Sequence, residues 1–191
     1  PVLFQAGASK RGLQFAGSNA EAVFVNSPTK EILKEQVTKI RDAAEAAGRN
    51  RDDIRIYTML TPIVAETHEA AQAKFEEYKS YADLNGALAL LSGWTGIDFS
   101  GYDLDDVIGE DVQSNAIQSS VETFKKASGD TGKPWTIRQL AEWIGVGGFG
   151  PTAVGTGREV AEQLIGWVAA AGVAGFNLAY AITPGTFEDV V

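Results

Sequence analysis

Short apolar runs alternate with helical patterns along this chain, and this alternation limits the fold more than any other feature. Each run has the length of a strand and little polar alternation, which is typical of strands in parallel sheets covered by helices. The segments between them repeat apolar residues at helical spacing. The order predicts an α/β fold with a parallel sheet. We expect strands at residues 2–4, 22–26, 54–65 and 174–181.

Hydroxyl side chains mark the starts of five predicted helices, because serine and threonine are favoured N-caps. Ser27 is followed by Pro28, which suits a first helical position. Thr136 and Thr156 each have Gln or Glu three residues later, the spacing of a capping box. The five expected N-caps are Ser9, Ser27, Thr67, Thr136 and Thr156.

The regular alternation is interrupted between residues 83 and 151. Gly, Asp and aromatic residues gather at 94–109, a helix is expected at 114–127, and 146–151 is a glycine-rich loop. We interpret 83–151 as a lid-like insertion before the last helix–strand unit, within one partial domain spanning 1–191. Long insertions of this kind usually carry function.

The turn between the first strand and the first helix is a candidate anion site. Gly7 and Ala8 precede Ser9, and Lys10 and Arg11 add two cations. A helix N-terminus presents free backbone N–H groups at the positive end of the helix dipole, which favours phosphate. The alternative is an ordinary βα turn with basic residues on its surface.

The charge balance limits the partners of the chain. A net charge of −9 and a pI near 4.6 argue against general binding of nucleic acid or anionic membranes. No cysteine is present, so disulfides and thiolate chemistry are excluded. We see no membrane span or signal peptide, and take a reducing cytoplasm as the default compartment. The start at Pro1, directly in a strand-like run, suggests the middle of a longer polypeptide.

Neither the histidine of this chain nor the carboxylates of the insertion indicate a metal site or an acid–base site. His68 is the only histidine and lies outside the apolar stripe of its predicted helix, which favours a solvated surface position. Six carboxylates of the insertion do not have the spacing of a calcium loop, so a solvated segment is expected. They are Asp98, Asp103, Asp105, Asp106, Glu110 and Asp111.

Strands that each feed a helix suit either an open doubly wound sheet or part of a (β/α)8 barrel. A dinucleotide-binding sheet would need G-x-G-x-x-G after the first strand and an acidic residue after the second. Gly7 and Gly12 do not have that spacing, and the second strand ends at Asn26. The barrel is therefore favoured, although four strands form only half of one.

Six separated blocks carry a family resemblance, at residues 5–16, 20–24, 92–98, 114–119, 175–180 and 183–187. These blocks resemble the flavin-dependent monooxygenases of the bacterial luciferase-like superfamily. The resemblance is strongest to the two-component group that includes nitrilotriacetate, dibenzothiophene-sulfone and long-chain-alkane monooxygenases. It implies that the chain is the C-terminal half of a TIM barrel, strands five to eight.

The resemblance implies FMN, used as FMNH2, as the cofactor, with its phosphate at the turn after the first strand of this chain. Gly7, Ala8, Ser9, Lys10 and Arg11 then become the cofactor-binding residues. Ser9 would bond the phosphate through its hydroxyl, and the backbone N–H groups of Lys10 and Arg11 would support it. This position departs from the common barrel site after strands seven and eight.

The resemblance also implies a pocket for a small organic substrate, lined by Phe24, Asn26, Trp94 and Phe149. Phe24 could instead be ordinary core. Trp94, expected in a polar loop, could pack on the surface. Phe149 could act as a lid residue or belong to a mobile loop.

The residues that support oxygen activation in this superfamily come from the N-terminal half, so no catalytic residue is expected here. The resemblance implies a separate NAD(P)H:flavin reductase, a missing N-terminal half-barrel and a homo-oligomer when complete. We expect no turnover from this chain alone. Two alternatives stay open: a deazaflavin-dependent oxidoreductase, and a non-catalytic half-barrel that acts as an interaction or assembly module.

Overall fold

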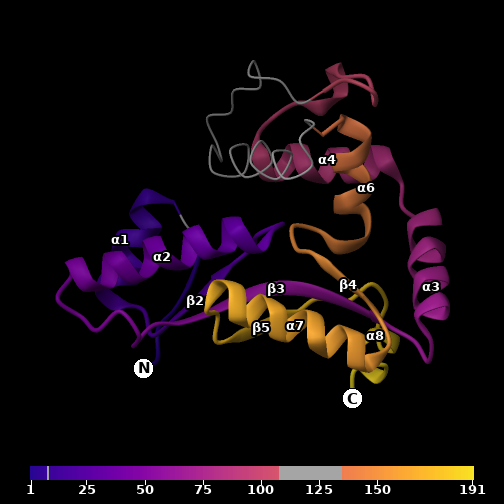
Figure 1. Ribbon diagram of the computed structural model, residues 1–191. Coiled ribbons are helices and arrows are strands. Elements are labelled where there is room, and N and C mark those ends of the chain that lie inside the picture. Colours follow the sequence, from indigo (N-terminus) through magenta and orange to yellow (C-terminus); the bar gives the residue numbers. More distant parts are fainter. Residues whose placement is uncertain (8, 108–134) are drawn as a thin grey trace.

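The computed structural model describes residues 1–7, 9–107 and 135–191, and shows one parallel sheet with helices packed around it (Figure 1). The helix expected at 114–127 and the block 114–119 lie outside these residues. All strand pairs are parallel. The strands are β1 (Phe4–Ala6), β2 (Ala22–Val25), β3 (Arg55–Val64), β4 (Thr152–Gly155) and β5 (Gly175–Leu178).

Four of the five predicted N-caps are confirmed, at Ser9, Thr67, Thr136 and Thr156. Ser27 is wrong as a cap. Thr29 caps that helix instead, while the buried Ser27 hydroxyl donates to the Thr29 carbonyl at 3.1 Å.

The helices are α1 (Lys10–Asn19), α2 (Lys30–Ala46), α3 (His68–Ser80), α4 (Leu84–Thr95), α6 (Ile137–Gly147), α7 (Gly157–Ala171) and α8 (Gly185–Glu188), with a 3-10 turn η1 (Phe99–Gly101).

The long strand β3 organises the sheet, because every other strand except β1 pairs with it. Along one edge, β2 pairs with Arg55–Thr58 and β4 with Thr61–Val64. Along the other edge, β5 pairs with Tyr57–Leu60. The sequence did not predict β4. Pro62 is in register with Ala153 of β4, and the ladder between β3 and β5 ends before it, at Leu60.

One face of the sheet is covered by α1, α2 and α7 and forms the main core. Side chains alternate between the faces of a strand, and Val23, Ile56 and Leu60 point to this side. The apolar stripe predicted for α2 is confirmed. Its five members, Ile32, Leu33, Val37, Ile40 and Ala44, are all buried.

The opposite face of the sheet carries aromatic side chains that remain accessible. Phe4 stacks on Phe24 at a ring-centroid distance of 5.6 Å, and Phe24 meets Tyr57 at 5.7 Å. The first strand was predicted to be buried, but Phe4 is 58% exposed. The reason is that β1 has only β2 as a partner and no described helix covers this face.

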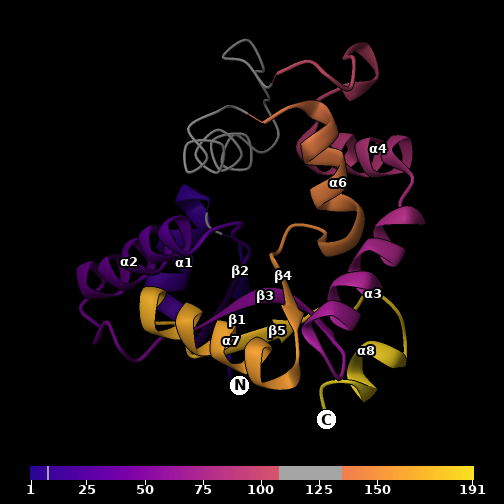
Figure 2. The ribbon, with the colours of Figure 1, turned by 45° about the vertical axis from the view of Figure 1, so that its right-hand side comes forward.

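The insertion has a core of its own. Leu91 of α4 packs with Ile137 and Leu140 of α6, and all three are fully buried. Figure 2 shows α4 and α6 crossing above the sheet, joined to it through α3 on one side and β4 on the other. The description of the chain as one partial domain, with 83–151 inserted, stays a prediction.

Candidate functional site

The turn after β1 is held in shape by its neighbours. Gly7 adopts a φ of +96°, a left-handed conformation that suits glycine, and its N–H donates to the Phe24 carbonyl at 3.2 Å. Ser9 then caps α1, since its Oγ accepts from the Gly12 N–H at 3.1 Å. These bonds fix the turn to β2 and leave the serine hydroxyl proton free to be donated elsewhere.

The residues of this turn have the chemistry of an anion site. Ser9, Lys10 and Arg11 are exposed, whereas Gly12 is buried beneath them. A Cβ at Gly12 would lie 3.2 Å from Ser9 Oγ and 3.3 Å from the Gly7 carbonyl oxygen, so a side chain would crowd the turn. The first N–H groups of a helix have no acceptor within the helix, which leaves those of Lys10 and Arg11 as donors. Ala8 lies outside the described residues.

Phe24 lies on the sheet face opposite the helices. It is half-buried between Phe4 and Tyr57, and so does not belong to the core under α2 and α7. Asn26 follows the end of β2 and is exposed. Its carbonyl is 3.5 Å from the Gln36 side-chain nitrogen, at the limit of a hydrogen bond. Its role and that of Phe24 in a pocket stay predictions.

Trp94 and Phe149 come together although they are far apart in the sequence. Their ring centroids are 4.6 Å apart, and Trp143 meets Phe149 edge-on at 6.3 Å. Trp94 was expected in a polar loop. It lies instead in the last turn of α4, because Asp83 caps an apolar helix and Gly96 ends it with a φ of +68°.

The loop that carries Phe149 also reaches the open face of the sheet. A Cβ on Gly150 would lie 3.1 Å from the Met59 carbonyl oxygen and 2.9 Å from Met59 Cε, so glycine lets the loop approach the backbone of β3 closely. Met59 follows Tyr57 by two residues and shares its face. Among the described aromatic residues, no ring contact joins Phe24 directly to Trp94 or Phe149. Gly150, which follows Phe149, approaches Met59 on the sheet face that carries Phe24 and Tyr57.

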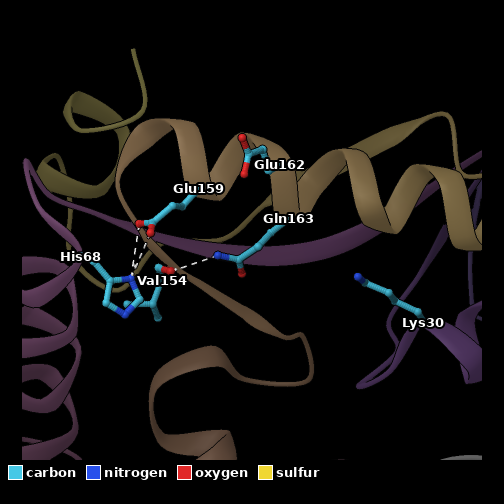
Figure 3. Close-up of a pocket in the computed structure, with 6 residues that line it drawn as sticks. All are labelled: Lys30, His68, Val154, Glu159, Glu162 and Gln163. Atoms are coloured by element: carbon cyan, nitrogen blue, oxygen red, sulfur yellow. Dashed lines mark hydrogen bonds and ion pairs between the residues drawn. The ribbon is translucent and has the colours of Figure 1, made fainter.

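A separate shallow pocket of about 410 Å³ lies on the helix side of the sheet (Figure 3). His68 Nδ1 is 3.3 Å from Glu159 Oε1, and both side chains are partly exposed. The expected surface position of His68 is confirmed, but sequence reasoning missed its partner, which is distant in the sequence. The lining residues are Lys30, His68, Val154, Glu159, Glu162 and Gln163.

Glu159 completes the capping box of α7. The backbone N–H of Thr156 donates to its carboxylate at 2.8 Å. This hydrogen bond, together with His68 beside it, holds the pKa of Glu159 below its ordinary value. The Glu159 carboxylate therefore stabilises the N-terminus of α7. The same hydrogen bond fixes the orientation of its side chain in the pocket, without any ligand.

The carboxylates of the insertion bond mainly to nearby backbone and to one arginine. Asp98 caps η1, Asp106 accepts from the Asp103 N–H at 2.8 Å, and Asp105 pairs with Arg138 at 3.2 Å. Glu110 and Asp111 lie outside the described residues. Within residues 1–7, 9–107 and 135–191, no three His or acidic side chains form a group that could hold a metal ion. In the same ranges no helix is long and apolar enough to cross a bilayer.

Known proteins resemble this chain over its whole length. The sequence profile described as "Luciferase-like monooxygenase" matches residues 1–175. Dimethyl-sulfide monooxygenase of Hyphomicrobium sulfonivorans is 46% identical over 191 residues, and long-chain alkane monooxygenase of Geobacillus thermodenitrificans is 35% identical. Nitrilotriacetate monooxygenase component A of Aminobacter aminovorans is 29% identical. Each match covers 100% of this chain but only 39%, 38% and 42% of the relative.

Solved structures resemble this chain in fold as well as in sequence. The crystal structure of DmoA from Hyphomicrobium sulfonivorans superposes with a TM-score of 0.83 at 46% identity, covering 99% of this chain and 39% of that one. A riboflavin lyase solved with modified FMN and riboflavin gives 0.82 at 33% identity, covering 100% and 42%. The chain therefore spans less than half the length of the proteins that it matches.

Proposed function

Because this chain belongs to the luciferase-like monooxygenase family, whose members are flavin-dependent enzymes, we propose that it supplies the FMN-binding C-terminal half-barrel of a two-component monooxygenase. The predicted fold class, an α/β half-barrel, is confirmed by the parallel sheet and by the structural matches. The use of FMN in its reduced form, the substrate and the partners belong to the proposal.

The observation that carries the proposal is the exposed turn at the start of α1. It lies at the carboxyl end of β1, the edge of a parallel barrel at which active sites form. Ser9 would donate its hydroxyl proton to the FMN phosphate, and the N–H groups and side chains of Lys10 and Arg11 would complete the anion site. Gly7, with its positive φ, would shape the turn. When bound, the reduced flavin supplies the electrons that activate O2.

The aromatic residues would form the walls of the reaction chamber. Phe24 offers an apolar surface at the mouth of β2, and Asn26 adds one amide beside it. Trp94 and Phe149 would close the mouth from the insertion and exclude water, which shelters reactive intermediates. This lining suits a small organic substrate. The family resemblance to component A supports a separate NAD(P)H:flavin reductase as the electron source, and the remaining half-barrel and a homo-oligomer complete the proposed assembly.

The phosphate site is tested by two substitutions of Ser9 in the full-length protein that contains this sequence. Ser9→Ala removes the hydroxyl and also the cap, whereas Ser9→Asp keeps a good cap but places a carboxylate against the phosphate. We expect Ser9→Asp to weaken FMN binding by about ten-fold, the size of one charge-assisted contact, without lowering the melting temperature.

The control is Ser18→Ala, which changes an exposed serine at the other end of the same helix. Fluorescence titration with FMN measures all three variants. An FMN affinity that is the same in Ser9→Asp and the wild type would remove the turn from the cofactor site. The half-barrel would then be better explained as an interaction module.

A further inference from the structure

Arg49 binds the carbonyl end of the helix that carries the proposed phosphate turn. Its guanidinium donates from Nη1 to the Ala16 carbonyl at 3.3 Å and the Gly17 carbonyl at 3.0 Å, and from Nη2 to the Ala20 carbonyl at 2.8 Å. The carbonyls at the end of a helix lack intrahelical partners. The Ala16 carbonyl accepts one other hydrogen bond, from the Ala20 N–H at 3.0 Å, and α1 has no basic residue in its last turn. Arg49 supplies further donors and the missing positive charge.

The end of α2 directs Arg49 to this position. Gly48 adopts a φ of +76°, and the Arg49 N–H donates back to the Ala44 carbonyl at 3.0 Å. This left-handed ending reverses the chain. The Arg49 side chain therefore leaves α2 in a fixed direction, toward the C-terminus of α1.

The contact between α1 and α2 is close enough to define one position for α1. A Cβ on Gly17 would lie 2.5 Å from the carbonyl carbon and oxygen of Ala43, so the helix backbones touch at this point. A helix of 10 residues is too short to be stable alone, so its position depends on such contacts. Gly17 sets the distance between the helices, and Arg49 holds the end of α1 against sliding and fraying.

We propose that Arg49 is a positioning residue for FMN, which it would not touch. By holding the carbonyl end of α1, it keeps the N–H groups at the other end aligned on the phosphate. The helix transmits this constraint as a rigid rod about 15 Å long. This inference rests on the proposed function, because it concerns the same phosphate turn.

The test compares FMN with riboflavin, which has the same ring system and ribityl chain but no phosphate. In the full-length protein, we expect Arg49→Ala to weaken FMN binding by about ten-fold, within the range for hydrogen bonds to a charged group. Riboflavin affinity should change by less than about two-fold, since its contacts do not involve the turn. Arg49→Lys keeps the charge but loses the fork of donors, so it should restore part of the FMN affinity.

Arg51→Ala is the matched control. This neighbouring arginine pairs with Asp42 at 3.3 Å and Glu45 at 3.4 Å, and both of these partners lie on α2 and not on α1. Its removal should leave the FMN-to-riboflavin ratio unchanged. If Arg49→Ala does not fold, Arg49→Lys is compared with the wild type instead, and a smaller loss restricted to FMN is expected.

The outcomes separate this inference from the proposed function. If the wild type binds FMN and riboflavin equally, the phosphate site itself is wrong and the inference falls with it. If Ser9→Asp reduces the preference for FMN but the Arg49 variants weaken both ligands equally, or neither, the positioning role alone is overturned.

Discussion

Gly17 and Gly93 are both helical glycines, yet alanine should have opposite effects at the two positions. A Cβ on Gly17 would collide with the Ala43 backbone, whereas a Cβ on Gly93 would have no atom within 4 Å. We expect Gly17→Ala to lower the free energy of unfolding by about 1–3 kcal/mol, as overpacking does. Gly93→Ala should raise it by up to about 1 kcal/mol, because alanine favours a helix. Urea denaturation of the full-length protein measures both. Changes of the same sign would contradict the contact described for Gly17.

Glu159 predicts a dependence of stability on pH. Its pKa is depressed in the folded protein by the Thr156 N–H and by His68. Such a carboxylate stabilises the fold above its unfolded pKa, about 4.3, and this contribution is lost as the pH falls through the lower folded pKa. Glu159→Gln keeps the capping box but not the charge. The wild type should therefore melt at a higher temperature than Glu159→Gln near neutral pH, and the difference should shrink as the pH falls below about 4.

Thermal melts across a pH series, with Glu162→Gln as the exposed control on the same helix, test this prediction. A difference between the wild type and Glu159→Gln that stays constant down to low pH would show that the charge of Glu159 does not stabilise the fold.

At the scale of elements, the insertion should unfold separately from the sheet. Leu140 is fully buried, but in the cluster between α4 and α6 and not in the core under the sheet. We expect Leu140→Ala to cost about 2–5 kcal/mol and to raise amide hydrogen exchange in α4 and α6. Exchange in α2, whose Leu33 lies in the other core, should not change. Faster exchange throughout the chain would mean that the two cores unfold as one.

Local chemistry determined which elements the sequence could predict. Thr136 and Thr156 set helix starts through hydrogen bonds to residues three positions away, so their capping boxes were visible in the sequence. The prediction of Ser27 as an N-cap was wrong because its buried hydroxyl donates to the Thr29 carbonyl instead. The strand β4 was missed because its four residues pair only with the distant β3, and nothing local identifies them.

In the candidate site too, features formed by neighbouring residues were predicted, and contacts between distant residues were not. The Ser9 turn is formed by consecutive residues and was predicted, although its role still awaits a test. The contact of Trp94 with Phe149 and the pairing of His68 with Glu159 join residues far apart in sequence. The spacing of residues in the sequence could not have found these contacts, although the family resemblance had assigned Trp94 and Phe149 to one pocket.

At the scale of the whole molecule, the sheet face opposite the helices carries an exposed row of aromatic side chains. Phe4 is 58% exposed and begins the row that continues through Phe24 and Tyr57. Exposed apolar patches of this kind mark interfaces. We expect residues 1–191 alone to bind the dye ANS strongly and to self-associate, unlike the full-length protein.

Phe4→Ser should reduce ANS binding by the isolated chain. Phe15→Ser, which removes a similarly exposed phenylalanine from α1, should reduce it less because Phe15 lies outside the row. A monomeric, ANS-silent chain on gel filtration would contradict the prediction.

The double attachment of the insertion to β3 has an evolutionary consequence. The insertion leaves β3 through α3 and returns as β4 on the same strand, beside the Met59 and Gly150 contact. Lengthening a loop whose ends are already fixed costs little free energy. Selection can therefore change the outer part of the insertion, which the proposed function places at the mouth of the substrate pocket, without changing the sheet that carries the proposed phosphate turn.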